Sequence, residues 1–420
     1  MSEERQLLVG IDLGDDITQI SCFDFKRYEP IPVGKMTGKE REYEIPMVVA
    51  INPNKSIWLW GSEAQEPGEG FVKIDGIMSK VCEGDRFEAD GYTFKSRELL
   101  KRFLIKELSL LKEYYPNNTI RKLVISVSDK TERITECLRT ICSELGIGSD
   151  RLIIQSHKQS YMYYAVSQDK ELWVNNVGLF EYDSKGLRYS QINIDRSSVP
   201  GIVGVTQKDL SDVMSGMMLI TEDDAHMRYA FTNVAKTVLH KQRVTTIYVT
   251  GKGFDGEWAA DALKDLCNGR RVFRGQNLFT RGACYAAREI SGEGKLSDFV
   301  FLDDEMITSD ITIKVYKDAG YQEVELAKAG TMWSEVDSSI DVIPDAEDEI
   351  QITARNILKH EFKSHMLSLS SFAGRENRMT RFTIRIRFAD RNTCIVTLKD
   401  NGFGEFCPSS NRIWETQINV

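Results

Sequence analysis

The sequence lacks several features that mark particular classes of protein. Its 420 residues include eight cysteines without a C-x-x-C pair and five histidines without zinc-type spacing, so neither a disulfide framework nor a metal cluster is expected. No apolar run approaches the ~18 residues of a membrane-spanning helix. An apolar strand begins within a few residues of the N-terminus, which leaves no room for a signal peptide. Basic residues are spread along the chain, and the net charge of −9 disfavours a general nucleic-acid-binding surface. We therefore expect a cytoplasmic protein with reduced thiols, no nucleic-acid partner and no membrane partner.

The most informative stretch present is residues 7–25, LLVGIDLGDDITQISCFDF. It predicts an apolar strand that ends in an aspartate, a turn containing a glycine, and a second strand that alternates in period 2. An acidic residue at the end of a buried strand is costly unless it meets a cation or hydrogen-bond donors. The neighbouring glycine would let backbone N–H groups approach a phosphate.

Strands and helices alternate through the first part of the chain. The stripe of leucines in residues 92–115 predicts a helix, and residues 122–127, KLVISV, predict a buried strand. From Val177 the sequence VGLFEYDSKGLRYSQINI repeats the opening order of strand, acid, turn and alternating strand. This repetition predicts a duplicated α/β domain over residues 1–297, with lobes of about 1–170 and 171–297.

From about residue 298 the pattern changes to strands in period 2. In residues 381–388, Phe382 and every second residue after it are apolar, while arginines and a threonine occupy the other face. The preceding segment, 292–297, is polar and glycine-containing, as an exposed linker would be. The sequence therefore predicts a separate all-β domain over residues 298–420.

In order and spacing, these segments resemble the seventy-kilodalton heat-shock chaperones of the actin-like ATPase superfamily along nearly the whole chain. Residues 12–16, D-L-G-D-D, stand where the superfamily has a first phosphate loop of the form D-x-G-T-x. Residues 151–164 stand where it has R-I-I-N-E-P-T-A-A-A, and residues 251–254 where it has the adenosine-contacting V-G-G-S. The final strands resemble the peptide-binding sandwich. The resemblance implies a duplicated ribonuclease-H-like (actin-like ATPase) domain followed by an all-β sandwich domain.

The resemblance also implies a nucleotide site, with ATP and magnesium as its cofactors and Asp12 holding the metal through the magnesium–nucleotide complex. The nucleotide-binding candidates that it gives are Asp12, Gly14, Asp15, Gly251, Lys252, Gly253 and Gly282. Two alternatives stay open. Asp12 at a strand end is also typical of a turn-capping aspartate, and the glycine–lysine–glycine segment is also typical of an ordinary strand-to-helix turn.

Departures from the family pattern argue against catalysis. The second phosphate loop, expected as D-x-G-G-G-T, runs from Glu181 to Gly186 without two of its glycines, and the expected glutamate of E-P-T-A-A is Gln155. Glu181 and Asp183 are candidates for binding a cation, or surface carboxylates. The interval 194–246 is too short for the lobe that clamps adenine, and no helical lid is expected before Val420. No catalytic residue is assigned, ATP hydrolysis is expected to be absent or very slow, and binding of ATP and magnesium, or of no cofactor, stays open.

The function expected from this combination is that of a degenerate chaperone-like protein that binds a polypeptide or protein partner through its β domain. Phe372, Phe382 and Trp414 would line a peptide groove or fill the core of the β domain. Two other functions use the same α/β fold: an actin-like filament or scaffold protein, and a small-molecule kinase. A kinase would need the intact phosphate cradle that the segment from Glu181 to Gly186 lacks.

Overall fold

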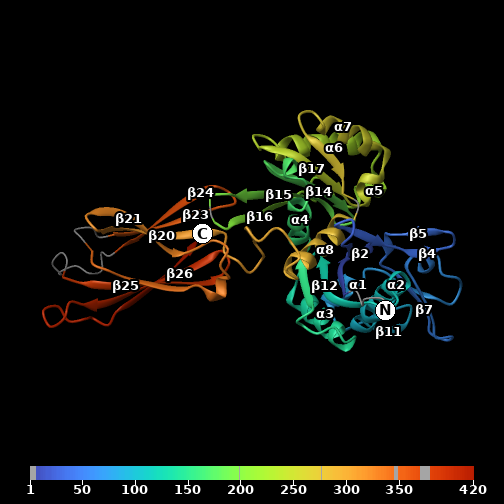
Figure 1. The fold of residues 1–420 in the computed structure, drawn as a ribbon, viewed down its shortest axis with the longest axis horizontal. Helices are drawn as coiled ribbons and strands as arrows, with labels where there is room; N and C mark the ends of the chain where they lie inside the picture. Colours follow the sequence, from blue (N-terminus) through green and yellow to red (C-terminus); the bar gives the residue numbers. More distant parts are fainter. Residues whose placement is uncertain (1–5, 198, 276, 345–348, 369–378) are drawn as a thin grey trace. The chain divides into compact units, whose positions relative to one another are not determined.

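The structure is a computed structural model that describes residues 6–197, 199–275, 277–344, 349–368 and 379–420. The chain divides into two compact units, coloured along the sequence in Figure 1. Unit 1 comprises Met1–Ile192 and Gln207–Asp298, and unit 2 comprises Asn193–Thr206 and Phe299–Val420. Unit 1 is mixed α/β, while the described part of unit 2 is built from strands and one 3₁₀ turn.

The first lobe of unit 1 is built on a sheet with the strand order β13-β12-β1-β2-β3. Strand β1 runs parallel to β12 and antiparallel to β2, and β12 runs parallel to β13. The strands of this sheet are β1 (Gln6–Leu13), β2 (Ile17–Asp24), β3 (Glu29–Val33), β12 (Thr119–Val127) and β13 (Leu152–Ser156), with β6 (Ile45–Pro46) pairing β2. The expected strand, turn and strand of residues 7–25 are therefore confirmed.

Helices and small sheets complete the first lobe. The helices are α1 (Ile77–Glu83), α2 (Ser96–Tyr114) and α3 (Glu132–Glu144), and the smaller elements are β4 (Lys35–Thr37), β5 (Glu40–Glu42), β7 (Val49–Asn52), β8 (Ile57–Trp60), η1 (Gly61–Ala64), β9 (Val72–Ile74), β10 (Arg86–Ala89) and β11 (Tyr92–Lys95). The helix expected over residues 92–115 begins only at Ser96. Its predicted first turn pairs with β10 as a hairpin strand instead.

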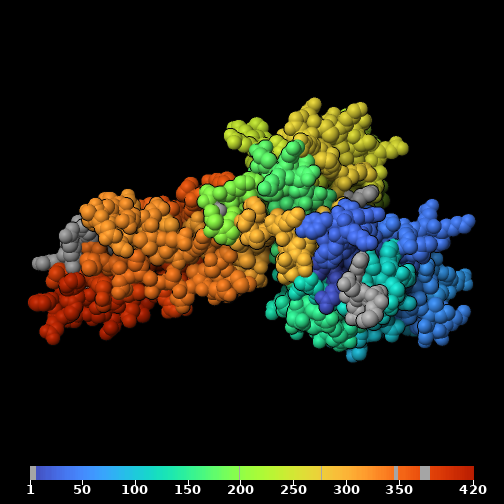
Figure 2. All heavy atoms as spheres, viewed as in Figure 1, coloured from blue at the N-terminus to red at the C-terminus, as the bar shows by residue number. Residues whose placement is uncertain are grey.

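The second lobe is built on a six-stranded sheet in which five strands, β18-β17-β14-β15-β16, repeat the strand order of the first lobe. The sixth strand, β19 (Phe299–Phe301), pairs with β16. Strand β14 runs antiparallel to β15 and parallel to β17, which runs parallel to β18. The strands are β14 (Asn176–Asp183), β15 (Gly186–Asp195), β16 (Gly201–Asp209), β17 (Val244–Thr250) and β18 (Arg271–Arg274). The other elements are η2 (Lys170–Leu172), α5 (Met218–Thr221), α6 (Asp224–Val238), η3 (Lys252–Asp255) and α7 (Glu257–Leu266). Helices α6 and α7 lie side by side over this sheet in Figure 1, and their apolar residues share its core. In Figure 2 their atoms form part of the yellow surface.

Helices α4 (His157–Val166) and α8 (Leu278–Ile290) pack against each other between the two sheets. The contact is close because a Cβ atom added at Gly282 of α8 would lie 1.9 Å from the carbonyl oxygen of Ser160 of α4. A Cβ atom added at Gly10 of β1 would likewise lie 2.4 Å from the backbone nitrogen of Cys284 of α8. These glycines bring the first turns of both helices to the strand ends, where the candidate site lies.

The described residues of unit 2 contain two four-stranded sheets that share one hydrophobic core. Their strand orders are β21-β20-β23-β24 and β22-β25-β26-β27. The elements are β19 (Phe299–Phe301), β20 (Ser309–Lys317), β21 (Gly320–Ala327), η4 (Trp333–Glu335), β22 (Asp337–Val342), β23 (Glu349–Asn356), β24 (Glu361–Ser368), β25 (Arg381–Asp390), β26 (Thr393–Gly402) and β27 (Ile413–Asn419). Every second residue of β25 from Phe382 to Phe388 is buried, as its sequence pattern predicts.

Residues 193–206 belong to unit 2, although the sequence analysis places them in the second lobe. Gly201 to Val203 of β16 pair with β19, and Ile202 joins a small cluster of buried residues that includes Leu302. Of the groove candidates, Phe382 is buried in the core, Trp414 packs at the margin of that core, and Phe372 lies outside the described residues. No helix in the described ranges combines the length and apolar character needed to cross a membrane.

Candidate functional site

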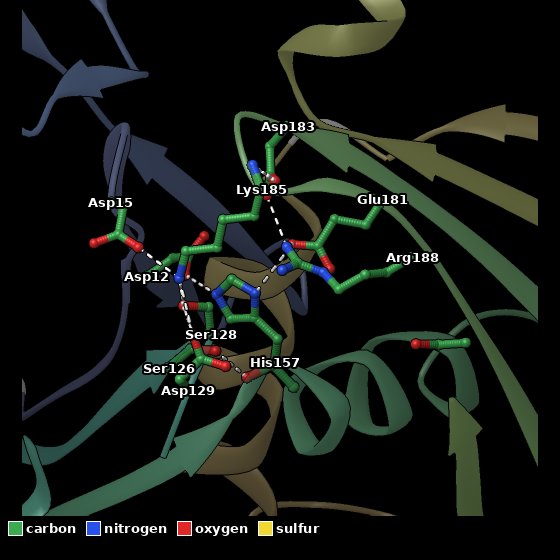
Figure 3. Close-up of polar contacts among 12 residues, drawn as sticks. Asp12, Asp15, Ser126, Ser128, Asp129, His157, Glu181, Asp183, Lys185 and Arg188 are labelled. Carbon is green, nitrogen blue, oxygen red and sulfur yellow. Dashed lines mark hydrogen bonds and ion pairs between the residues drawn. The ribbon is translucent and has the colours of Figure 1, made fainter. Parts of the chain in front are cut away.

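A cleft in unit 1 lies where strands of both sheets end. Asp12 near the end of β1 and Glu181 near the end of β14 occupy corresponding places in the two sheets, and both line the cleft. Figure 3 shows their side chains directed toward one another, with a histidine between them. In α/β folds, functional side chains commonly gather at the carboxyl ends of the strands. The cleft is therefore the candidate site.

His157 bridges the two carboxylates. It is the first residue of α4, whose start is fixed by a capping box between Ser156 and Gln159. Its Nε2 atom lies 2.7 Å from Oδ1 of Asp12, and its Nδ1 atom lies 3.4 Å from Oε1 of Glu181. The first contact is a hydrogen bond and the second is an ion pair. The imidazole ring also stacks on Phe279 of α8, with ring centres 3.7 Å apart.

The charges of these groups depend on one another. Burial disfavours a protonated imidazole, but the carboxylates of Asp12 and Glu181 outweigh it and raise the pKa of His157 to about 10. Burial likewise disfavours an ionised Glu181, but His157 and Arg188 outweigh it and lower the pKa of Glu181 to about 2. At neutral pH, His157 is therefore a cation held between two carboxylates.

Arg188 of β15 adds a second cation to the same group. Its Nη2 atom lies 2.9 Å from Oε1 of Glu181 and 2.7 Å from Oδ2 of Asp183. Glu181 and Asp183 were candidates for binding a cation. In the described structure, the cations beside them are side chains of the protein itself.

Lys185 joins the turn between β14 and β15 to the first lobe, as Figure 3 shows. Its Nζ atom lies 2.6 Å from Oδ2 of Asp15 and 2.8 Å from Oδ2 of Asp129. These carboxylates raise the pKa of Lys185 although burial opposes them, so the side chain stays charged. The neighbouring Ser184 donates a hydrogen bond of 2.8 Å from its hydroxyl to Asp16. The two turns are thus bonded directly to each other.

Backbone N–H groups in both turns donate within the turns themselves. The N–H of Gly14 donates to the carbonyl of Ile17 over 3.0 Å. The N–H of Lys185 donates to Oδ1 of Asp183 over 2.9 Å. Phosphate-binding loops instead direct such groups at the ligand, so these two donors do not form a phosphate cradle.

The cleft is small and acidic. Its cavity volume is about 100 Å³, against ~300–1,000 Å³ for typical small-molecule sites. Seven carboxylates and four cationic side chains line it, which leaves a formal charge of −3. A larger cavity, of about 610 Å³, adjoins it and shares Asp15, Asp16 and Lys185 in its lining.

The structure brings five of the seven predicted site residues together. The residues that line the cleft are Asp12, Gly14, Asp15, Gly251 and Lys252.

Gly253 and Gly282 lie outside this lining and pack closely instead. A Cβ atom at Gly253 would lie 2.4 Å from the ring of Tyr182, while Gly282 packs on α4. Gly251 lines the cleft but also has a positive φ of 97°, and an added Cβ would lie 2.2 Å from the carbonyl oxygen of Tyr182. All three glycines therefore have a packing role.

Sequence reasoning missed His157, Lys185 and Arg188. It aligned Gln155 with a catalytic glutamate, but Gln155 is buried and donates to Ser160, outside the cleft lining. The capping-box pattern S-x-x-Q, from residue 156 to residue 159, is readable in the sequence and places His157 at the helix start beside the strand ends. Lys185 was interpreted only as the loss of a glycine.

Residues 30–304 match the family model described as "Family of unknown function (DUF5716) C-terminal". The chain belongs to this family. Residues 306–420 match a second model, "Domain of unknown function (DUF8552)". No curated protein matches the chain. Within the DUF5716 match lie His157, Glu181, Lys185 and Arg188, whereas the turn containing Asp12 precedes it.

Proposed function

We propose that this DUF5716 protein is a degenerate relative of the heat-shock chaperones that binds a polypeptide or protein partner without control by nucleotide. In this proposal unit 1 is a duplicated ribonuclease-H-like domain of the actin-like ATPase type, and it serves as a scaffold. Unit 2 is the sandwich domain that binds the partner.

The same order of five strands in the two sheets supports the fold part of the proposal. In both sheets, the first strand pairs antiparallel with the second and parallel with the fourth. Helices α4 and α8 follow the fifth of these strands in each sheet, β13 and β18, and pack on each other. A gene duplication of one α/β unit would produce this correspondence.

The observation that carries the functional part is the place of His157 and Lys185. These two cations hold carboxylates at the strand ends and turns of both lobes, where a magnesium–nucleotide complex would need the same carboxylates. The fit to ATP and magnesium is poor for two further reasons: two turn amides donate internally, and the lining is acidic, which disfavours phosphate. Phosphoryl transfer relies on positioning and on positive charge at the phosphates. We therefore assign no hydrolytic step to this cleft.

Strand β24 supports a binding role for unit 2. It lies at the edge of its sheet among the described strands, and its outward face carries Phe362, 70 % exposed, and Met366, 53 % exposed. An edge strand can add an extended peptide through main-chain hydrogen bonds, with exposed side chains giving specificity. Large apolar side chains on an edge strand are otherwise a risk for aggregation.

Fluorescence anisotropy with labelled apolar heptapeptides tests the proposal. We expect dissociation constants in the micromolar range or weaker, unchanged within twofold by millimolar ATP and magnesium. The double variant Phe362→Ser with Met366→Ser should weaken binding at least tenfold. Tyr321→Ser, on the opposite edge strand β21 and 72 % exposed, is the matched control and should bind normally. No binding at millimolar peptide, or a tenfold change on adding nucleotide, would refute the proposal.

A further inference from the structure

A completely buried glutamate lies directly behind the Asp12 strand end. Glu107 of α2 has no exposed surface, and its Oε1 atom lies 2.6 Å from the hydroxyl of Thr18 on β2. The same hydroxyl lies 2.7 Å from the backbone carbonyl oxygen of Asp12. Glu107, Thr18 and Asp12 thus form a continuous chain of short contacts that ends at the residue bound to His157.

The number of available protons decides whether Glu107 is protonated in this row of contacts. A threonine hydroxyl has one proton to donate, and a backbone carbonyl has none. If Thr18 donates to an ionised Glu107, its oxygen and the Asp12 carbonyl oxygen face each other at 2.7 Å without a proton between them. If Glu107 is protonated, it donates to Thr18, and Thr18 donates to the carbonyl. Only the second arrangement makes both contacts hydrogen bonds.

The surroundings of Glu107 give a second, independent argument. Its other oxygen, Oε2, is buried without a hydrogen-bond partner, a cost that is much greater for a carboxylate than for a neutral acid.

No cation pairs with Glu107 among the residues that the structure describes. On its own helix, Lys101 pairs with Glu144 of α3 and Arg102 pairs with Glu98. From the elements packed around it, the ionisable group that acts on Glu107 is Asp12 of β1, which carries the same sign of charge. Burial and Asp12 outweigh the hydrogen bond from Thr18 and raise the pKa of Glu107 to about 8.

We infer that Glu107 is a neutral carboxylic acid that donates its proton to Thr18 and, through Thr18, positions the Asp12 carbonyl and the strand end that binds His157. Glu107 is a positioning residue and lies outside the cleft lining. The inference depends on the hydrogen bonds behind the cleft, and it holds whether or not unit 1 binds nucleotide. Raising the pH removes the proton and turns the Thr18 hydroxyl toward the new carboxylate, so the Asp12 carbonyl loses the hydrogen bond from Thr18.

Infrared difference spectroscopy of wild type against Glu107→Gln tests the protonation state. The glutamine amide can still donate to Thr18, so the variant should fold and keep the chain of hydrogen bonds. At pH 7 we expect about ten protonated molecules for each ionised one. Wild type should then show the carbonyl band of a protonated acid, absent from the variant, halved near pH 8 and lost by pH 10. A missing band at pH 6.5, or a band that persists in the variant, would overturn the inference.

The pH dependence of unfolding gives a readout that a purely structural role would not move. Glu107 keeps its proton in the folded protein up to a higher pH than in the unfolded chain. The free energy of unfolding should therefore fall as pH rises from the ordinary pKa of the acid, near 4.5, to about 8, and this group causes no further fall above that pH. Between pH 5 and pH 7, the unfolding constant of wild type should rise about 100-fold relative to Glu107→Gln. Thr18→Ser, which keeps the hydroxyl, should behave as wild type, whereas in Thr18→Val the fall in stability should extend to higher pH, because the hydrogen bond of Thr18 lowers the pKa of Glu107. Equal pH profiles for wild type and Glu107→Gln would contradict the inference. If Glu107→Gln fails to fold, the infrared band of the protonated acid in the two Thr18 variants decides the question. The band must be unchanged in Thr18→Ser and shifted in Thr18→Val.

Discussion

Replacing His157 by glutamine removes the imidazolium that holds Asp12 and Glu181 together. The glutamine side chain is polar and of similar size, so the change removes chiefly the positive charge. Glu181 retains Arg188 as a partner, but Asp12 loses the cation whose Nε2 atom lies 2.7 Å from its Oδ1 atom. Breaking a buried ion pair by removing one partner typically costs ~3–5 kcal/mol, because the other charge stays buried.

The size of the effect follows from the pKa of His157. The group titrates near 6.5 when unperturbed and at about 10 in the folded protein. A raised pKa for a base means that the folded state holds the proton more tightly than the unfolded state. The stabilisation of the fold by protonated His157 is therefore complete below pH 6.5 and is lost as pH rises toward 10. At one pKa unit per 1.36 kcal/mol, the contribution is about 4 kcal/mol at pH 7. The part of the lowered pKa of Glu181 that comes from His157 is the same interaction and is not counted twice, while the remainder comes from Arg188.

Urea denaturation at a series of pH values measures this contribution. Between pH 8 and pH 9.5, wild type should lose about 2 kcal/mol of unfolding free energy relative to His157→Gln. This pH window lies above the range in which titration of Glu107 changes the stability, so the contributions of His157 and Glu107 can be measured separately. Tyrosines and cysteines also titrate at high pH, but they are common to both proteins and cancel in the difference.

His240→Gln is the matched control because His240 is exposed. It should follow wild type at every pH. If His157→Gln keeps the wild-type slope between pH 8 and pH 9.5, then His157 is not a buried cation in the folded protein and the account of the cleft fails.

Three further predictions concern single side chains. Lys185→Ala leaves its carboxylate partners without a cation, so calorimetry should detect binding of magnesium that wild type and Lys185→Arg do not show; no heat with the alanine variant would contradict this role. Gly282→Ala should lower the unfolding free energy by about 1–3 kcal/mol through overpacking against α4, whereas Gly68→Ala, whose added carbon meets nothing within 4 Å, should be neutral; equal stabilities would exclude the close helix contact. Ile202→Ala should destabilise unit 2 by about 2–4 kcal/mol, and no loss in calorimetric unfolding would show that residues 193–206 do not belong to its core.

Local patterns made much of the fold predictable. The period-2 alternation after Gly14 predicts the second strand of the first lobe, and the repeat at Val177 predicts its counterpart in the second lobe. Period 2 also predicts the strands of unit 2. The predicted start of α2 was wrong because a short hairpin strand, β11, whose apolar residues Tyr92 and Phe94 are two apart, precedes Ser96.

The candidate site was predictable only in part, because its contacts join residues that are far apart in the sequence. Asp12 was identified from its strand end, but its partner His157 lies 145 residues away, and local patterns carry no information on such a pairing. Glu107 did leave a local signal. It falls on the apolar stripe of α2, three residues after Leu104 and four before Leu111, where a charged residue is out of place.

The central claim is that the protein's own cations occupy the place of a magnesium–nucleotide complex in the cleft. Calorimetric titration of ATP and magnesium into the wild-type protein tests this claim most directly. We predict no saturable heat up to millimolar nucleotide. Saturable binding with a micromolar dissociation constant that is abolished by Asp12→Ala would contradict it.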